Sequence, residues 1–358
     1  MFYQMLKKIL LFMEDLQNKN DVLIIAEAGV NHNGDFNMAL ELIDQASLAG
    51  AHYIKFQTFK ASKITTLNAK KSEYQLKNQS IDETQYEMLK SLEIPLNWYP
   101  KLIDYCKKKN IKFLSTGFDI DSIDFLDKLN MPLYKIPSGE ITHKKLLKHI
   151  ASKKKNIILS TGMAEMSEIN DAINVLTSEG INKEQITILH CSTQYPTPLE
   201  DVNLLAMLDI KKRLNLKKVG YSDHTQGIEV PIAAVSLGAK VIEKHITLNK
   251  NLPGPDHKAS LDPTEFKKMV EGIKSVSIAL SGSGIKEPNN AELKNKNSIR
   301  KSLHYQNKLI VGTKLEERHF IALRPGDGVS PMQIDFFIGK RLKCDTDMYQ
   351  KCNLNDIK

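Results

Sequence analysis

Short runs of β-branched and other apolar residues recur along the chain, and stretches with helical spacing separate them. This alternation is typical of parallel β–α units. We predict strands at 22–27, 51–56, 111–116, 132–136, 156–161, 185–190, 217–221 and 239–244. Eight such units in about 280 residues fit the length of a (β/α)8 barrel. A Rossmann fold would require a glycine fingerprint after the first strand, and the segment EAGVNHNG at 27–34 is not one. The predicted class is therefore α/β, with a TIM barrel.

The barrel does not account for the whole chain. Ser281–Gly284 (SGSG) and the polar residues that follow predict a linker, and the last 60 or so residues carry short strand-like runs and turn signals. We predict an N-terminal extension at 1–20, a barrel at 21–281, a linker at 282–297 and a small β-rich domain at 298–358. The apolar run at 9–13 is followed by Glu14 and Asp15, so it is too short for a membrane span and lacks a signal cleavage site. We expect a cytoplasmic protein, and Met13 could be its natural start, with 1–12 an extension.

Composition narrows the possible partners. The net charge is +8, yet only five of the 50 basic residues are Arg and the lysines are spread along the chain. Nucleic-acid binders usually concentrate Arg and aromatic residues on one face, so we expect no nucleic-acid partner, and an anionic small substrate fits the charge as well. The four cysteines lack zinc-ligand spacing, which fits reduced cytosolic thiols.

Polar residues gather where the predicted strands end. In a barrel, the carboxyl ends of the strands converge on one mouth, and active sites are built there. The residues at or just past these ends are Glu27, Lys55, Thr116, Lys135, Ser138, Ser160, His190, His224 and His245. This clustering predicts a polar active site at the barrel mouth.

His224 and His245 follow two strands that are adjacent in the predicted barrel. Two imidazoles side by side, completed by water, can hold a divalent metal ion. Each histidine could instead be an ordinary hydrogen-bonded loop residue. The pair, with Glu27 facing it across the barrel, favours a metal.

Lys55 and Lys135 lie on two further strands, and burying a lysine is costly without an anionic partner. One interpretation is a salt bridge to Glu27 or Glu140. The functional interpretations are a Schiff-base amine or a clamp on phosphate and carboxylate groups. The nearby hydroxyls of Thr116, Ser138 and Ser160 favour the anion clamp.

Several strings resemble, in order, the motifs of bacterial sialic acid synthases: KFQTFKA, YQLK, KIPSGE, LSTGM, HCSTQYPTP, GYSDHTQG, IEKHITL and PGPDHKAS. The segment LRPGDG at 323–328 resembles the antifreeze-like (SAF) domain of that family. The resemblance runs from about residue 22 to 340. It implies a barrel and an SAF domain in a domain-swapped homodimer, with each SAF domain reaching over the partner's active site.

The resemblance also implies roles for individual residues. His224 and His245 would hold a divalent metal, Mn2+ with Mg2+ or Co2+ as substitutes, and Glu27 would be the essential carboxylate beside it. Arg324 would contact the sugar of the other subunit. The residues that would bind phosphoenolpyruvate are Lys55, Gln57, Thr116, Lys135, Ser138 and Ser160, and those that would face the amino sugar are Glu140, Tyr195 and Asp256.

The implied activity is that of a transferase that condenses phosphoenolpyruvate with N-acetylmannosamine or a related amino sugar and releases phosphate. Thr193 and Gln194 occupy a variable part of the HCSTQYP motif, and AEAGVNHNG and GPDHKASL resemble legionaminate synthases at least as closely. An N,N'-diacetyllegionaminate synthase using 2,4-diacetamido-2,4,6-trideoxymannose is therefore the alternative. More distant alternatives are a Schiff-base aldolase on the same barrel and a non-catalytic carbohydrate-binding protein.

Overall fold

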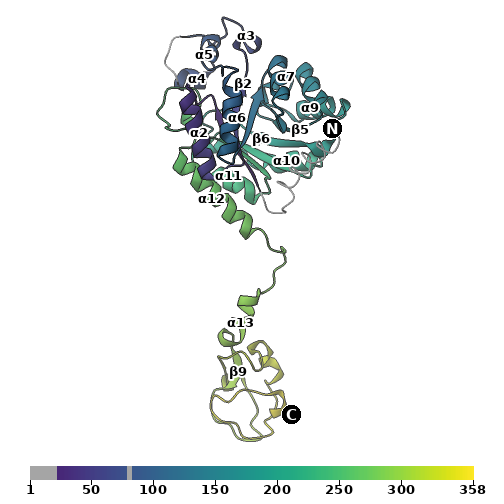
Figure 1. Cartoon of the computed structure of the whole chain (residues 1–358). Coiled ribbons are helices and arrows are strands. Elements are labelled where there is room, and N and C mark those ends of the chain that lie inside the picture. The colour runs from purple at the N-terminus through teal and green to yellow at the C-terminus, as the bar shows by residue number, and fades with distance from the viewer. Residues whose placement is uncertain (1–21, 79–82) are drawn as a thin grey trace. The chain divides into compact units, whose positions relative to one another are not determined.

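The computed structural model describes residues 22–78 and 83–358, which divide into two compact units after Ser281 (Figure 1). The first unit holds the predicted barrel, and the second begins at Gly282. The predicted N-terminal extension at 1–20, including Met13, lies outside the described residues. Each unit is considered by itself below.

Eight parallel strands form the sheet of the first unit, in the hydrogen-bonded order β3-β2-β1-β8-β7-β6-β5-β4. The end strands β3 and β4 lie against each other, so the sheet curls into a nearly closed barrel. This confirms the predicted (β/α)8 fold. The strands are β1 (Leu23–Gly29), β2 (Tyr53–Thr58), β3 (Lys112–Gly117), β4 (Leu133–Ile136), β5 (Asn156–Ser160), β6 (Ile186–Cys191), β7 (Val219–Asp223) and β8 (Val241–His245).

Alternate residues of each strand point into the barrel, because successive side chains of a strand face opposite sides. The inward residues in the lower half form one apolar cluster: Leu23, Ile25, Tyr53, Leu114, Leu133, Ile158, Leu189 and Val241. Gly220 lies beside this cluster, where an added Cβ would come within 2.4 Å of the Val241 carbonyl oxygen, so no larger residue fits. The barrel is thus a packed core below its mouth.

Helices surround the strands (Figure 1) and cover their outward side chains in a second, larger apolar core. Helix α2 shows how local sequence sets the boundaries: Asp35 caps its first turn, and Gly50 ends it with a φ of 86°. The helices are α2 (Phe36–Ala49), α3 (Ala61–Ile64), α4 (Glu73–Asn78), α5 (Gln85–Ser91), α6 (Trp98–Lys108), α7 (Ile120–Lys128), α8 (Lys144–Ser152), α9 (Met166–Ser178), α10 (Ala206–Arg213), α11 (Glu229–Ser236) and α12 (Pro263–Ala279).

The second unit contains a two-stranded antiparallel sheet, β9 (Ser302–Tyr305) and β10 (Phe320–Leu323), over its own small apolar core. Helix α13 (Asn290–Ile299) precedes it and occupies much of the segment that we expected to be a linker. Asn289 and Glu292 form a capping box at its start, which explains why this polar stretch is helical.

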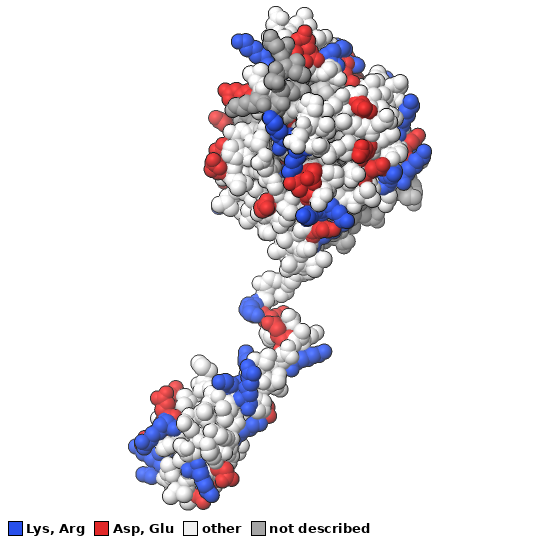
Figure 2. All heavy atoms as spheres, turned by 90° about the vertical axis from the view of Figure 1, so that its left-hand side faces the viewer, with Lys and Arg blue, Asp and Glu red and all other residues white. Residues whose placement is uncertain are grey.

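Charged side chains are mixed on the visible face of the barrel unit. Figure 2 shows Lys and Arg interspersed with Asp and Glu there, so the excess positive charge does not form a single patch on that face. Among the described residues, none of the helices combines the length and apolar character that a membrane crossing requires.

Candidate active site

A pocket opens at the carboxyl ends of the barrel strands, as predicted. Most of the predicted site residues line it: Glu27, Lys55, Gln57, Thr116, Lys135, Ser138, Ser160, Tyr195, His224, His245 and Asp256. The alternation of strand side chains explains this convergence. Residues 27, 55 and 135 each follow an inward core residue by two positions, so they too point inward, one layer higher.

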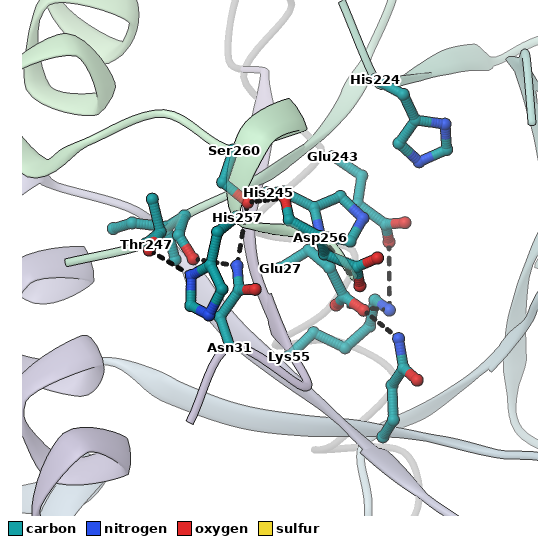
Figure 3. A network of polar contacts seen from close by, with 12 residues as sticks. Glu27, Asn31, Lys55, His224, Glu243, His245, Thr247, Asp256, His257 and Ser260 are labelled. Carbon is teal, nitrogen blue, oxygen red and sulfur yellow. Dashed lines mark hydrogen bonds and ion pairs between the residues drawn. The ribbon is translucent and has the colours of Figure 1, made fainter. Parts of the chain in front are cut away.

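The two lysines are paired with buried carboxylates (Figure 3 shows Lys55 among them). Lys55 Nζ lies 2.6 Å from Glu27 Oε2 and 3.7 Å from Glu243 Oε2, and Lys135 Nζ lies 3.0 Å from Glu243 Oε1. Lys55 also donates to Thr116 Oγ1 at 2.8 Å. The salt-bridge interpretation of these lysines was therefore right for Glu27, whereas Glu243, not Glu140, is the second partner.

Burial and ion pairing shift the pKa values of these buried residues in opposite directions. Burial raises the pKa of Glu27, although Lys55 partly counteracts it. Burial alone would lower the pKa of Lys55, but Glu243 and Glu27 outweigh it and the pKa is raised. Burial would raise the pKa of Glu243, but Lys135 and Lys55 lower it. Lys55 and Glu243 are thus held charged, and of the two carboxylates beside Lys55, Glu27 takes up a proton more readily than Glu243.

Hydroxyl groups lie beside the lysines. Ser138 Oγ accepts a hydrogen bond from the Gly162 amide at 2.9 Å, while the buried Ser160 Oγ has no partner among the described residues. Ser222 donates to Glu243 Oε1 at 3.1 Å. An unpaired buried hydroxyl next to lysines can donate a hydrogen bond to an anionic ligand without breaking an existing hydrogen bond.

His224 and His245 lie side by side in the pocket, with ring centroids 5.3 Å apart. His224 Nδ1 is hydrogen-bonded to the Ser192 carbonyl oxygen, which leaves Nε2 to face a ligand. His245 Nδ1 is buried without a hydrogen-bond partner in the described part of the chain. Burial lowers the pKa of His224 to about 4 and that of His245 well below its usual value, so both are neutral.

Two neutral imidazoles with open nitrogens fit a divalent ion, because a metal-binding imidazole must be unprotonated. Within the described residues, no group of three or more His, Cys, Asp and Glu side chains is arranged to hold a metal. The protein would therefore supply two ligands, and substrate and water the others.

Asp256 and two tyrosines line the pocket next to the histidines. Asp256 Oδ2 lies 3.8 Å from His245 Nδ1, and burial followed by repulsion from Glu27 raises the pKa of Asp256 to about 7. Tyr195 stacks on Tyr74 with centroids 4.8 Å apart and packs against His224. This part of the pocket offers a carboxyl group, two phenol groups and a flat apolar surface, which suits a sugar.

The structure leaves three predicted residues outside the pocket. His190 points outward and binds the Val202 carbonyl oxygen at 3.0 Å, because the inward positions of β6 are 189 and 191. Placing His190 at the mouth was therefore wrong. Glu140 is paired with His143 at 2.7 Å and does not line the pocket. Arg324 belongs to the second unit, where its Nε donates to the Ile299 carbonyl oxygen.

Several residues that line the pocket were not predicted from the sequence. Among them are Glu243, Ser222, Cys191 and Tyr74. Glu243 and Cys191 could have been found by counting two residues along the strand from another inward position, since 245 and 189 point inward. Tyr74 lies on helix α4, in the segment between β2 and β3, and no local sequence pattern predicts its place at the mouth.

Comparisons with known proteins identify the family of this chain. A sequence profile of the NeuB family matches residues 42–286. The chain is 50% identical over 318 residues to N,N'-diacetyllegionaminic acid synthase of Campylobacter jejuni subsp. jejuni serotype O:2, which covers 89% of this chain and 95% of that protein. It is 46% identical over 321 residues to the enzyme of the same name from Legionella pneumophila subsp. pneumophila, covering 89% of this chain and 90% of that one.

A solved structure is also similar. N-acetylneuraminic acid (sialic acid) synthetase from Leptospira borgpetersenii serovar Hardjo-bovis, in complex with citrate, superimposes with a TM-score of 0.67 at 33% identity, covering 77% of this chain and 90% of that one. The predicted resemblance to sialic acid synthases is thus confirmed, and the chain belongs to the NeuB family.

Proposed function

We propose that this chain condenses phosphoenolpyruvate with the open-chain aldehyde of an amino sugar, forming a nine-carbon acid and releasing phosphate. The observation that carries the proposal is the mouth itself, where two buried lysines, an unpaired serine and two neutral histidines surround Glu27. Membership of a family of synthases supports the reaction class.

The reaction has a simple balance of bonds. The methylene carbon of phosphoenolpyruvate attacks the aldehyde carbon, whose oxygen takes up a proton. Water then adds to the cationic second carbon of the former phosphoenolpyruvate, and the bond from that carbon to the phosphate oxygen breaks. Lys55, Lys135 and Ser160 would hold the phosphate and carboxylate in place, and Glu27 would take the proton of the attacking water.

His224 and His245 would hold a divalent ion, for which we propose Mn2+, with Mg2+ or Co2+ as substitutes. When bound, such an ion supplies Lewis-acid polarisation of the aldehyde. The neutral state of both imidazoles supports this assignment.

The identities to known relatives favour one of the two candidate sugars. Two proteins that are 50% and 46% identical are N,N'-diacetyllegionaminic acid synthases, whereas the sialic acid synthetase structure is 33% identical. We therefore favour 2,4-diacetamido-2,4,6-trideoxymannose over N-acetylmannosamine as the substrate.

A Schiff-base aldolase is the rival enzymatic function. A lysine acts as a nucleophile only when its amine is unprotonated. Glu243 and Glu27 raise the pKa of Lys55, which favours its ammonium form, and Lys135 is ion-paired with Glu243. These contacts support the anion clamp instead.

The second unit would be an SAF domain that completes the partner's active site in a domain-swapped homodimer, with Arg324 contacting the sugar. The cytoplasmic location expected from the sequence remains a prediction.

Phosphate release from phosphoenolpyruvate tests the function. We expect release with the diacetamido sugar, slower release with N-acetylmannosamine and none without a sugar. Borohydride should trap no covalent adduct. No release with either sugar, or a trapped adduct on Lys55 or Lys135, would contradict the proposal.

A further inference from the structure

Asn31 is buried beside the mouth but does not line the pocket. Its side chain is 1% exposed and lies between β8 and the loop at 253–260. The Nδ2 atom donates two hydrogen bonds, one to the Ile246 carbonyl oxygen at 2.8 Å and one to Ser260 Oγ at 2.9 Å. Figure 3 shows Asn31 reaching Ser260, close to His257 and Thr247. Both N–H groups of the amide are therefore used.

Each of these contacts leads to a residue of the site. Ser260 Oγ in turn donates a hydrogen bond to the Asp256 carbonyl oxygen at 2.7 Å. Ile246 directly follows His245, and its amide donates to the Glu27 carbonyl oxygen at 2.9 Å. One amide group thus connects the loop that carries Asp256 to the strand end that carries His245.

The loop at 253–260 has no strand or α-helix of its own to hold it. Besides the Asn31 contacts, Asn33 donates to the Pro253 carbonyl oxygen at 2.9 Å, and His257 binds Thr247 Oγ1 at 2.7 Å. His257, which directly follows Asp256, also binds Asn33 Oδ1 at 3.1 Å, and the Ala259 amide donates to the Asp256 carbonyl oxygen at 3.1 Å. Two side-chain hydrogen bonds, from Asn31 to Ser260 and from Ser260 to the Asp256 carbonyl oxygen, connect Asn31 to the backbone of Asp256.

We propose that Asn31 is a positioning residue for the sugar substrate. Through Ser260 it holds the Asp256 carboxyl group in the pocket, 3.8 Å from His245, where the sugar would enter. The inference rests on the proposed function, because it takes Asp256 to contact the amino sugar. Under the proposed function, phosphoenolpyruvate would bind on Lys55 and Lys135, whose hydrogen-bond and ion-pair partners are Glu27, Glu243 and Thr116 rather than residues of this loop.

The geometry explains why an amide is needed. The Ile246 carbonyl can only accept, and Ser260 Oγ already donates to Asp256, so Asn31 must donate to both. Loss of either donor frees the loop to shift, and small displacements of substrate-binding groups lower rates strongly.

The experiment separates the two substrates kinetically. In Asn31→Ala, we expect the KM for 2,4-diacetamido-2,4,6-trideoxymannose to rise about ten-fold, while the KM for phosphoenolpyruvate changes less than about two-fold. Ser260→Ala should show the same split. The double variant should raise the KM for the sugar no more than the more affected single variant does, because both changes break the same connection.

Tyr105→Phe is the matched control. It removes a partly buried hydrogen bond of 2.9 Å to Asp44, between α6 and α2, and leaves the mouth untouched. Its melting temperature should fall without a change in either KM. The proposal is overturned if Asn31→Ala and Ser260→Ala behave like this control, or if they raise both KM values equally. Failure of the proposed function is distinct, since wild-type protein would then release no phosphate.

Discussion

Lys135 is held in a buried ion pair and is also one of the residues proposed to bind phosphoenolpyruvate. It is buried and paired with Glu243, which also has Lys55 at 3.7 Å. In Lys135→Met, Glu243 therefore keeps one cationic neighbour. We expect kcat/KM for phosphoenolpyruvate to fall about ten- to a hundred-fold, because a charge-assisted contact is worth roughly 1.5–3 kcal/mol.

Steady-state kinetics alongside thermal melting would check this prediction. Lys145→Met is the control, since Lys145 is exposed on α8. A loss of stability with unchanged kcat/KM would leave Lys135 a structural ion-pair partner only.

The histidine pair gives a second prediction at this scale. Removing divalent ions with a chelator should abolish phosphate release, and Mn2+ should restore it in wild type but not in His245→Ala. Isothermal titration should also show that Mn2+ binding is lost in His245→Ala. Full turnover by metal-free protein would exclude the Lewis-acid role.

At the scale of elements, a buried ion pair on the outer side of the strands joins the ends of β7 and β8. Lys244 and Asp223 are fully buried, their charged atoms are 2.5 Å apart, and Lys244 also donates to the Thr225 carbonyl oxygen. Asp223 in turn accepts from the Thr225 amide and hydroxyl. The pair thus orders the turn around His224 and ties it to the strand that bears His245.

Breaking this pair should cost far more than breaking an exposed one. Lys244→Met leaves Asp223 buried without its counter-charge, and we expect the free energy of unfolding to fall by about 3–5 kcal/mol. Lys217→Met removes an exposed pair with Glu184 and should leave the free energy of unfolding nearly unchanged, because water and salt screen exposed charges. Denaturant titration of both variants measures the difference. Equal effects would show that the buried pair does not hold the two strand ends together.

At the scale of the whole molecule, the prediction concerns Arg324 in the second unit. If Arg324 completes the partner's active site, then mixed dimers of Arg324→Ala and Glu27→Ala chains carry both lesions at one mouth and neither at the other. Random pairing makes half of the dimers mixed, each with one intact mouth, so activity should recover to about a quarter of the wild-type value.

Co-expression of the two chains with different affinity tags allows the mixed dimers to be isolated and assayed. Each parent homodimer should be inactive. If isolated mixed dimers are as inactive as the parents, Arg324 does not act across subunits and the swapped arrangement fails.

The sequence by itself determined the barrel and most of its mouth. Apolar runs at regular spacing define β–α units because each strand must be covered by its helices, and parallel strands of a barrel bring their ends together. The order of residues along the chain was therefore enough to place Lys55, Lys135, His224 and His245 at one site. The family motifs supplied the expected roles.

Only the tertiary structure decided which side chains turn inward and which partners they meet. A shift of one residue along a strand moves a side chain to the opposite face, so His190 was assigned to the mouth while its neighbour Cys191 lies there. The bond between Lys135 and Glu243 joins residues 108 positions apart, on β4 and β8. The bond from Asn31 to Ser260 spans 229 positions. Such contacts depend on the closure of the whole barrel, and a local pattern of residues carries no information about them.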